Sequence, residues 1–258
     1  MKRALARTIA SLAPPRSAAG LRVLMYHAVD EPDAADVMAL RVRPAHFRAQ
    51  MTLLRDESYL VVPLATAIAV APVDGLRRVA ITFDDGYRSD TEAARVLREF
   101  GFDATFFVAP RFLDGVRGPA GYWEAWDHLR WDDASALARA GFDIGAHSVS
   151  HPDLRKCTGA RLDEEVAGAR SRLEERLGVP VLHFSYPFGR HDGRVRQAVA
   201  TAGYRLACTS RYGLHRSSGP CMTVPRTEVT GRDDLATFRM KLQGRYDWVG
   251  YWQDVAPV

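Results

Sequence analysis

Short apolar runs alternate with amphipathic segments along most of the chain. The apolar runs predict β-strands at 21–26, 78–83, 104–109, 142–146, 181–186, 204–208 and 221–225. Nearly every position in these runs is apolar, whereas a strand with one face in water would alternate apolar and polar residues. Such continuous runs are typical of parallel strands that are buried on both faces.

Helical patterns lie between these runs and after the last one. They cover 44–58, 88–101, 132–141, 160–178 and a stretch that opens near 232 and closes the chain. Gly101, Gly141 and Gly178 stand where helices usually end. Alternating strands and helices predict a parallel sheet covered by helices. We expect an α/β protein with a distorted (β/α) barrel of about seven parallel strands, and an open doubly wound sheet is the alternative.

The chain divides into a leader and one domain. Residues 1–20 are basic, and their apolar centre is too interrupted for a secretory signal, so we expect a disordered or loosely packed leader. A short basic helix that touches anionic lipid is the alternative. Residues 21–258 contain no repeat or linker, which predicts a single domain that includes the C-terminal closing helix.

Composition narrows the class of protein. With 258 residues, 47% hydrophobic and 26% charged, the chain is typical of globular proteins. The net charge of +4 comes from dispersed basic residues, so no nucleic-acid partner is expected. Three widely spaced cysteines form no disulfide framework. We expect a cytoplasmic location. In the alternative with a lipid-touching helix, the basic N-terminus would also make weak contact with the inner membrane of a bacterium.

Polar residues of catalytic type follow five of the predicted strands. They are His27, Asp84 with Asp85, His147 with His151, Tyr186 and Arg226. Because the carboxyl ends of parallel strands open on the same face of a sheet, these residues are expected to meet in one site.

Two of these groups form a plausible metal set. His147 and His151 are four residues apart, but Pro152 disfavours a helix at His151, so the pair is expected on a loop. Asp85 with the two histidines makes an O/N/N set that leaves positions open for water and substrate, as catalytic zinc does. We expect zinc (Zn2+), and Co2+, Ni2+ or Mn2+ would fit the same ligands.

Three motifs in this order resemble a known family. The stretches TFDDG (82–86), HSVSH (147–151) and SYPFG (185–189) are similar to the motifs of the NodB-type polysaccharide deacetylases, carbohydrate esterase family 4. The early VLMYH stretch and YPFG place the chain nearest the poly-N-acetylglucosamine deacetylase-like branch. The resemblance implies a distorted barrel and metal-dependent hydrolysis of N-acetyl groups on hexosamines.

The resemblance also assigns roles to single residues. Asp84 matches the general base and Asp85 the metal-binding aspartate, while His147 and His151 match the paired histidine ligands. Tyr186 matches the residue whose backbone N–H helps to hold the oxyanion.

The general acid is less clear, because the family's late Leu-x-His segment has no close match. His27 is the first choice for this role, and His215 in YGLHR is the reserve. Arg226, or else Arg190, would keep Asp84 ionised.

The sequence therefore predicts an enzyme that removes N-acetyl groups from N-acetylhexosamine units of a poly-, oligo- or lipid-linked saccharide. Two alternatives remain. One is a glycan-binding member without activity, in which Tyr122, Trp123, Trp126 or Trp131 would stack on sugar rings. The other is an Fe(II) oxygenase, since two histidines and one carboxylate also form that facial triad.

Overall fold

The computed structural model describes residues 2–14, 20–69, 73, 75–117, 126–219 and 221–255. The strands among them are β1 (Leu21–Tyr26), β2 (Leu60–Val61), β3 (Arg78–Phe83), β4 (Thr105–Val108), β5 (Asp143–Ala146), β6 (His183–Ser185), β7 (Leu206–Cys208), β8 (Cys221–Val224) and β9 (Thr227–Glu228). They form one sheet in the order β8-β7-β6-β5-β4-β3-β1-β9, with β2 paired to β3. Every pairing is parallel.

The two ends of this sheet are joined by the chain itself. β8 and β9 lie at opposite ends of the strand order, yet only Pro225 and Arg226 separate them in sequence. A cluster of buried side chains from β1, β3, β4, β7 and β8, together with Leu64, fills the space that the strands enclose. The sheet therefore curls into a distorted (β/α) barrel, which confirms the predicted fold class.

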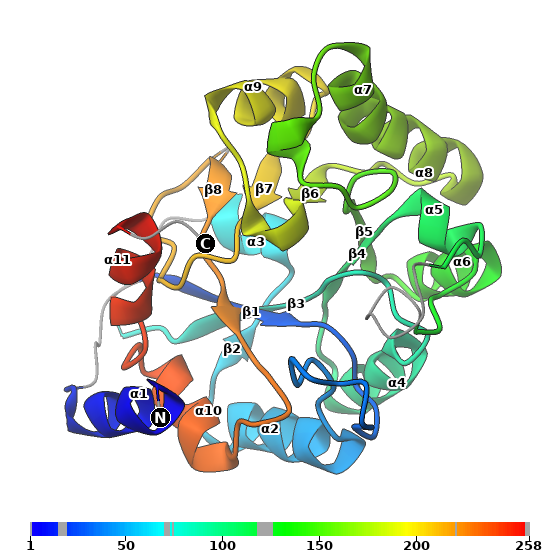
Figure 1. The fold of residues 1–258 in the computed structure, drawn as a ribbon. Coiled ribbons are helices and arrows are strands. Elements are labelled where there is room, and N and C mark those ends of the chain that lie inside the picture. The colour runs from blue at the N-terminus through cyan, green and yellow to red at the C-terminus, as the bar shows by residue number, and fades with distance from the viewer. Residues whose placement is uncertain are drawn as a thin grey trace.

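Most of the helices lie around the outside of the strands (Figure 1). They are α1 (Lys2–Leu12), α2 (Pro44–Asp56), α3 (Leu64–Ala69), α4 (Asp90–Phe100), α5 (Pro110–Leu113), α6 (Trp131–Arg139), α7 (Ala160–Asp163), α8 (Ala169–Leu177), α9 (Gly193–Thr201), α10 (Leu235–Leu242) and α11 (Trp248–Val255). Short 3₁₀ turns occupy η2 (Leu154–Lys156) and η4 (Pro187–Gly189), and the π-helical turn η3 (Glu164–Gly168) joins α7 to α8. No helix in the described part of the chain is long and apolar enough to span a membrane.

Side chains alternate between the inside and the outside of the barrel. On β3, Val79, Ile81 and Phe83 belong to the cluster beneath the helices, whereas Ala80 belongs to the barrel interior. The same alternation turns Asp84, which follows β3, towards the interior. This placement brings the first carboxylate of the TFDDG motif into the barrel at its carboxyl end.

The strand predictions agree closely with the structure. Two predicted strands match β1 and β3 residue for residue, and the other five are only slightly longer than β4 to β8. The structure adds two strands of two residues each, β2 and β9, and the helices α3, α5 and α9. The predicted helix at 160–178 is present as α7, η3 and α8.

The N-terminal segment differs from the expectation. Residues 2–12 form α1, whose Ala10 is fully buried, and Arg7 makes an ion pair of 2.8 Å with Asp234. Arg245 donates to the carbonyl oxygens of Ser11 and Ala13 at 3.1 and 2.9 Å. A disordered or loosely packed leader is therefore wrong for residues 2–12, because these contacts fix the helix beside α10. Residues 15–19 lie outside the described part of the chain.

Candidate active site

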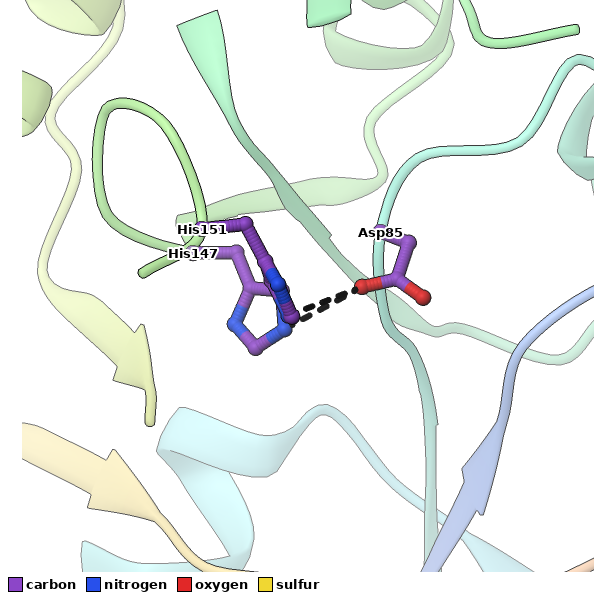
Figure 2. Close-up of side chains that lie close together, drawn as sticks. All are labelled: Asp85, His147 and His151. Carbon is purple, nitrogen blue, oxygen red and sulfur yellow. Dashed lines mark ion pairs between the residues drawn. The ribbon is translucent and has the colours of Figure 1, made fainter. Parts of the chain in front are cut away.

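The three predicted metal ligands converge at the carboxyl end of the barrel. The Nε2 atoms of His147 and His151 lie 3.3 and 3.4 Å from the same oxygen of Asp85, Oδ1 (Figure 2). One possible ligand atom from each residue lies within 4.8 Å of those of the other two, and all three side chains are buried. This O/N/N set fits a divalent cation, which would replace the direct contacts between the ligands.

Hydrogen bonds orient the ligand atoms. The Nδ1 of His147 lies 2.7 Å from the carbonyl oxygen of Ser185, which can only accept. Nδ1 therefore carries the proton, and the lone pair of Nε2 faces Asp85. The Tyr87 hydroxyl donates to Asp85 Oδ2 at 3.1 Å, which leaves Oδ1 to the histidines. Tyr87 was not among the predicted site residues, although it directly follows the TFDDG motif.

The backbone of the motifs is strained where it carries the ligands. Asp85, Ser148, His151 and Phe188 have φ of 74°, 59°, 57° and 59°, a region that side-chain-bearing residues rarely adopt. Such residues cost on the order of 1–3 kcal/mol each and are retained where the surrounding structure enforces them. The His151 N–H donates to Ser148 Oγ at 2.9 Å, which holds the turn that returns the second histidine to the site.

A buried glutamate anchors the histidine loop from the π-helical turn. The carboxylate of Glu165 accepts from the N–H and Oγ of Ser150 at 2.8 and 2.6 Å, and it pairs with Arg161 at 2.5 Å. The Val149 N–H donates to the Glu165 carbonyl oxygen at 3.1 Å. π-Helical turns occur often at functional sites, and here the turn presents both groups of one residue to the loop. The helical periodicity of 160–178 gave no sign of this contact.

Asp84 is held by a buried arginine, Arg226, which lies between β8 and β9 in the sequence. Arg226 donates from both terminal nitrogens to the two Asp84 oxygens, at 2.7 and 2.6 Å. It also donates to the Thr209 carbonyl, Thr82 Oγ1 and Ser185 Oγ, at 2.9, 3.2 and 2.9 Å. Ser185 Oγ in turn donates to Asp84 at 3.1 Å. The guanidinium group is thus fully hydrogen-bonded inside the barrel.

This contact sets the charge of Asp84. Burial alone raises the pKa of the Asp84 carboxyl, but the Arg226 guanidinium outweighs this effect through its positive charge and its hydrogen bonds. The net pKa lies below the ordinary value, so Asp84 is a carboxylate at neutral pH. An ionised carboxylate beside a metal set is a group that can accept a proton from water.

The two candidate acids lie at opposite ends of β1. The Asp84 N–H donates to the Tyr26 carbonyl at 3.0 Å, so His27 follows the strand end beside Asp84. His27 interacts electrostatically with both Asp84 and Asp85. Its Nδ1 is buried and has no hydrogen-bond partner among the described residues. Its position therefore suits a group that meets substrate.

His215 is placed elsewhere. Its backbone N–H and carbonyl pair with Leu21, the first residue of β1, at 3.0 and 2.8 Å. The full length of the strand separates this end of the barrel from Asp84. The reserve assignment of His215 as general acid is therefore wrong.

Two further predictions are corrected. The Tyr186 N–H donates to the Cys208 carbonyl at 3.1 Å within the sheet, so it is engaged and does not point at an oxyanion. The Tyr186 hydroxyl donates to the Met222 carbonyl at 3.1 Å on the outer side of the sheet. Arg190 contacts Asp153, at 3.4 Å, and makes no contact with Asp84. Arg226 is the arginine that contacts the proposed base.

Aromatic side chains line one edge of the site. Trp126 packs on Tyr87 with ring centroids 5.2 Å apart, under the Arg41 guanidinium, and these three residues line a cavity of about 490 Å³. Trp131 donates its indole N–H to Asp114 at 2.8 Å and packs against the core. Tyr122 and Trp123 lie outside the described residues.

His128, which lies next to Tyr87, was not predicted as a site residue from the sequence. His128 is buried and stacked between Tyr87 and Phe112, with ring centroids 4.9 and 4.2 Å away. Burial lowers the pKa of His128 to about 4, which keeps the ring neutral near pH 7. It supports Tyr87, whose hydroxyl holds Asp85.

Known proteins are similar to this chain in sequence and in fold. A chitooligosaccharide deacetylase of Azorhizobium caulinodans is 30% identical over 131 residues, 49% of this chain and 55% of that protein. A polysaccharide deacetylase structure from Bacillus cereus matches with a TM-score of 0.72 and 25% identity, over 86% of this chain and 69% of that one. The structure of IcaB from Ammonifex degensii matches with a TM-score of 0.72 and 23% identity, over 89% and 98%.

The family model described as polysaccharide deacetylase matches residues 73–207, more than half of the chain. This range contains Asp84, Asp85 and both histidines of the predicted metal set, whereas His27 and Arg226 lie outside it. The chain spans less than two thirds of the length of the curated relatives that it matches. On the family match, the three motifs and the barrel, the chain belongs to the polysaccharide deacetylase family.

Proposed function

We propose that the protein is a metal-dependent carbohydrate N-deacetylase that hydrolyses the acetamide of N-acetylhexosamine units in a poly-, oligo- or lipid-linked saccharide. One observation carries the proposal: an ionised Asp84, fixed by Arg226, lies next to the Asp85, His147 and His151 set. A base and a metal set side by side are what hydrolysis of an unreactive amide requires. The name of the Azorhizobium relative supports a glycan substrate.

Asp85, His147 and His151 would hold the cation, and zinc is the first expectation, with Co2+, Ni2+ and Mn2+ as alternatives. A divalent ion at this position lowers the pKa of water and polarises a carbonyl group. The histidine tautomer fixed by Ser185 keeps an Nε2 lone pair available for it.

The remaining steps belong to side chains of this chain. Asp84 accepts the proton of the attacking water, and Arg226 keeps the carboxylate ionised and fixed in direction. Proton donation to the sugar nitrogen is needed, because an amine does not leave as an anion. His27 takes this role in our proposal, since it enters the site from the strand next to Asp84.

The rival functions explain less of the site. An Fe(II) oxygenase would use the two histidines and Asp85 but would leave the buried Asp84–Arg226 pair without a role. A glycan-binding protein without activity would need neither the base nor the ligand geometry. The aromatic edge at Trp126 suits sugar binding in either an enzyme or a binding protein.

The test is acetate release from N-acetylated oligosaccharides, before and after chelation and after addition of each of the four metals. We expect activity that chelation removes and metal restores. A His147→Ala/His151→Ala variant should lose both bound metal and activity while its circular dichroism spectrum is unchanged. Equal metal content in this variant and the wild type would refute the ligand assignment.

A further inference from the structure

A second cavity lies on the side of the site away from Trp126. It has a volume of about 680 Å³ and is lined chiefly by polar and basic side chains. These include Arg155, Arg190, His191, Ser210, Arg211 and Gln253. Among the described residues that line it, none is an aspartate or a glutamate. We call it the basic cavity.

The basic cavity adjoins the metal set. Phe188 and Gly189 of the SYPFG motif line it, and the Phe188 ring lies 4.7 Å from the ring of His151. Gly189 has a φ of +66°, and a Cβ added there would lie 1.9 Å from Ser210 Oγ, so only glycine permits this close wall. A substituent in the cavity is thus one side chain away from a metal ligand.

The charges around the cavity do not balance. Arg155 pairs with both oxygens of Asp153, at 2.8 and 3.0 Å, and Arg190 reaches the same carboxylate at 3.4 Å. The Asp153 side chain is 8% exposed, whereas those of Arg155 and Arg190 are 36% and 34% exposed. Two guanidinium groups therefore share the Asp153 carboxylate, which lies behind them. Asp192 also attracts Arg155, but its carboxylate pairs with Arg194 at 3.7 Å.

The cavity also offers hydrogen-bonding groups at fixed positions. The Nδ1 of His191 is buried without a hydrogen-bond partner among the described residues, and the ring packs on Tyr186 at 4.8 Å. The Arg190 guanidinium lies 5.5 Å from the centre of the Phe188 ring. Arginine held in this way recognises carboxylate or phosphate oxygens through paired N–H groups.

We propose that the basic cavity binds an anionic group of the saccharide substrate, carried next to the N-acetylhexosamine whose acetyl group is removed. The inference rests on the proposed deacetylase function and narrows its substrate to acidic glycans. A phosphate and the carboxylate of a hexuronic acid share the required chemistry. A wholly neutral glycan would leave the excess positive charge unused.

The test compares three substrates at equal ionic strength. N-acetylchitotetraose is neutral, a hyaluronan tetrasaccharide supplies glucuronates beside N-acetylglucosamine, and chitobiosyl 1-phosphate supplies a phosphate. We expect at least one acidic substrate to exceed the neutral one by about tenfold or more in kcat/KM, the range for hydrogen bonds to charged groups. The preferred acidic substrate identifies the anion, and the preference should shrink as salt is added.

An Arg155→Gln/Arg190→Gln variant should lose this preference through a higher KM for the acidic substrate, with the neutral substrate unaffected. Arg95→Gln on the exposed face of α4 is the matched control. It should change neither the preference for the acidic substrate nor the kinetics with the neutral substrate. A wild type without any acidic preference, or a double variant that keeps the full preference, would overturn the inference.

Calorimetry with inorganic phosphate separates this inference from the proposed function. Phosphate that binds the wild type more tightly than the double variant supports the basic cavity even if no glycan releases acetate. Suppose that acetate is released from all three substrates at equal rates and that phosphate binds both proteins equally. This result would refute anion binding in the basic cavity and leave the proposed deacetylase function intact.

Discussion

Two buried arginine–aspartate pairs among the described residues are alike in geometry and differ in surroundings. Arg226 grips Asp84 through two bonds of 2.7 and 2.6 Å, and Arg22 grips Asp247 through two bonds of 2.6 and 3.1 Å. None of the four side chains is more than 8% exposed. The first pair lies inside the barrel at its carboxyl end. The second starts from the first half of β1, on the outer face.

The difference lies in the neighbours of each carboxylate. Asp84 lies beside His147, His27 and the metal set, and each nitrogen of Arg226 has a partner. Asp247 instead precedes α11, and the Nε of Arg22 is buried without a partner among the described residues. A buried ion pair is thus no sign of catalysis by itself, because desolvation offsets much of its attraction. The groups next to the carboxylate decide its role.

Asp84→Asn tests the catalytic role of the first pair directly. The amide has nearly the same shape but accepts no proton, so kcat should fall by about 10²–10⁴. Metal content should stay at the wild-type level, because the ligands are untouched. Acetate release and elemental analysis on the same preparation check both statements. Near-full activity with metal bound would show that Asp84 is not the base.

The matching change at the other pair is Asp247→Asn. It leaves the charge of Arg22 buried and unpaired, so the free energy of unfolding should fall by about 3–5 kcal/mol. The kcat of the folded protein should remain within twofold of the wild type, because the pair touches no site residue. Denaturant unfolding and steady-state kinetics measure the two quantities. A large loss of kcat with unchanged stability would erase the distinction between the pairs.

The two ends of β1 offer a second contrast. His27→Ala should lower the deacetylation rate by about 10², and the rate on an aryl acetate ester much less, because a phenolate leaves without a proton. His215→Ala, at the other end of the strand, should keep the amide-to-ester ratio of the wild type. The ratio is measured on purified variants with metal bound. Equal ratios in the two variants would remove His27 from the mechanism.

The smallest expected effect concerns His128, which supports the site without reacting. Its pKa of about 4 in the folded protein lies below the ordinary value near 6.5, so the unfolded chain binds the proton first as pH falls. Stability should therefore decline between about pH 6.5 and 4, by up to about 1.4 kcal/mol per pH unit. His128→Phe should flatten this slope, while His46→Phe on the exposed side of α2 should not. Identical slopes in both variants would contradict a buried neutral His128.

Much of this arrangement could be read from the sequence, because the strands are apolar throughout and the motifs follow them. The positions of Asp85, His147 and His151 followed from the rule that parallel strands end on one face. β2 and β9 were missed because two residues carry no pattern. α9 was missed because only Val195 and Val199 of its length are buried.

The contacts of single atoms were beyond the sequence. Whether the Tyr186 N–H is available depends on the register of β6 and β7, which pairs it with Cys208. Glu165 reads as one charged helix residue among several, and only the π-helical turn directs it at Ser150. Such details depend on three-dimensional register, which periodicity does not encode.

The junction at Pro225 and Arg226, where β8 and β9 close the barrel, has a consequence for folding during synthesis. Asp84 and Arg226 are separated by 142 positions, so a ribosome releases the base long before its counter-charge. Until this junction forms, Asp85, His147 and His151 can come together while Asp84 still lacks its contact with Arg226. If the proposed metal site is correct, the nascent chain should bind metal before the proposed base has its arginine partner. In the proposed deacetylase, hydrolysis would begin only after β9 has closed the barrel.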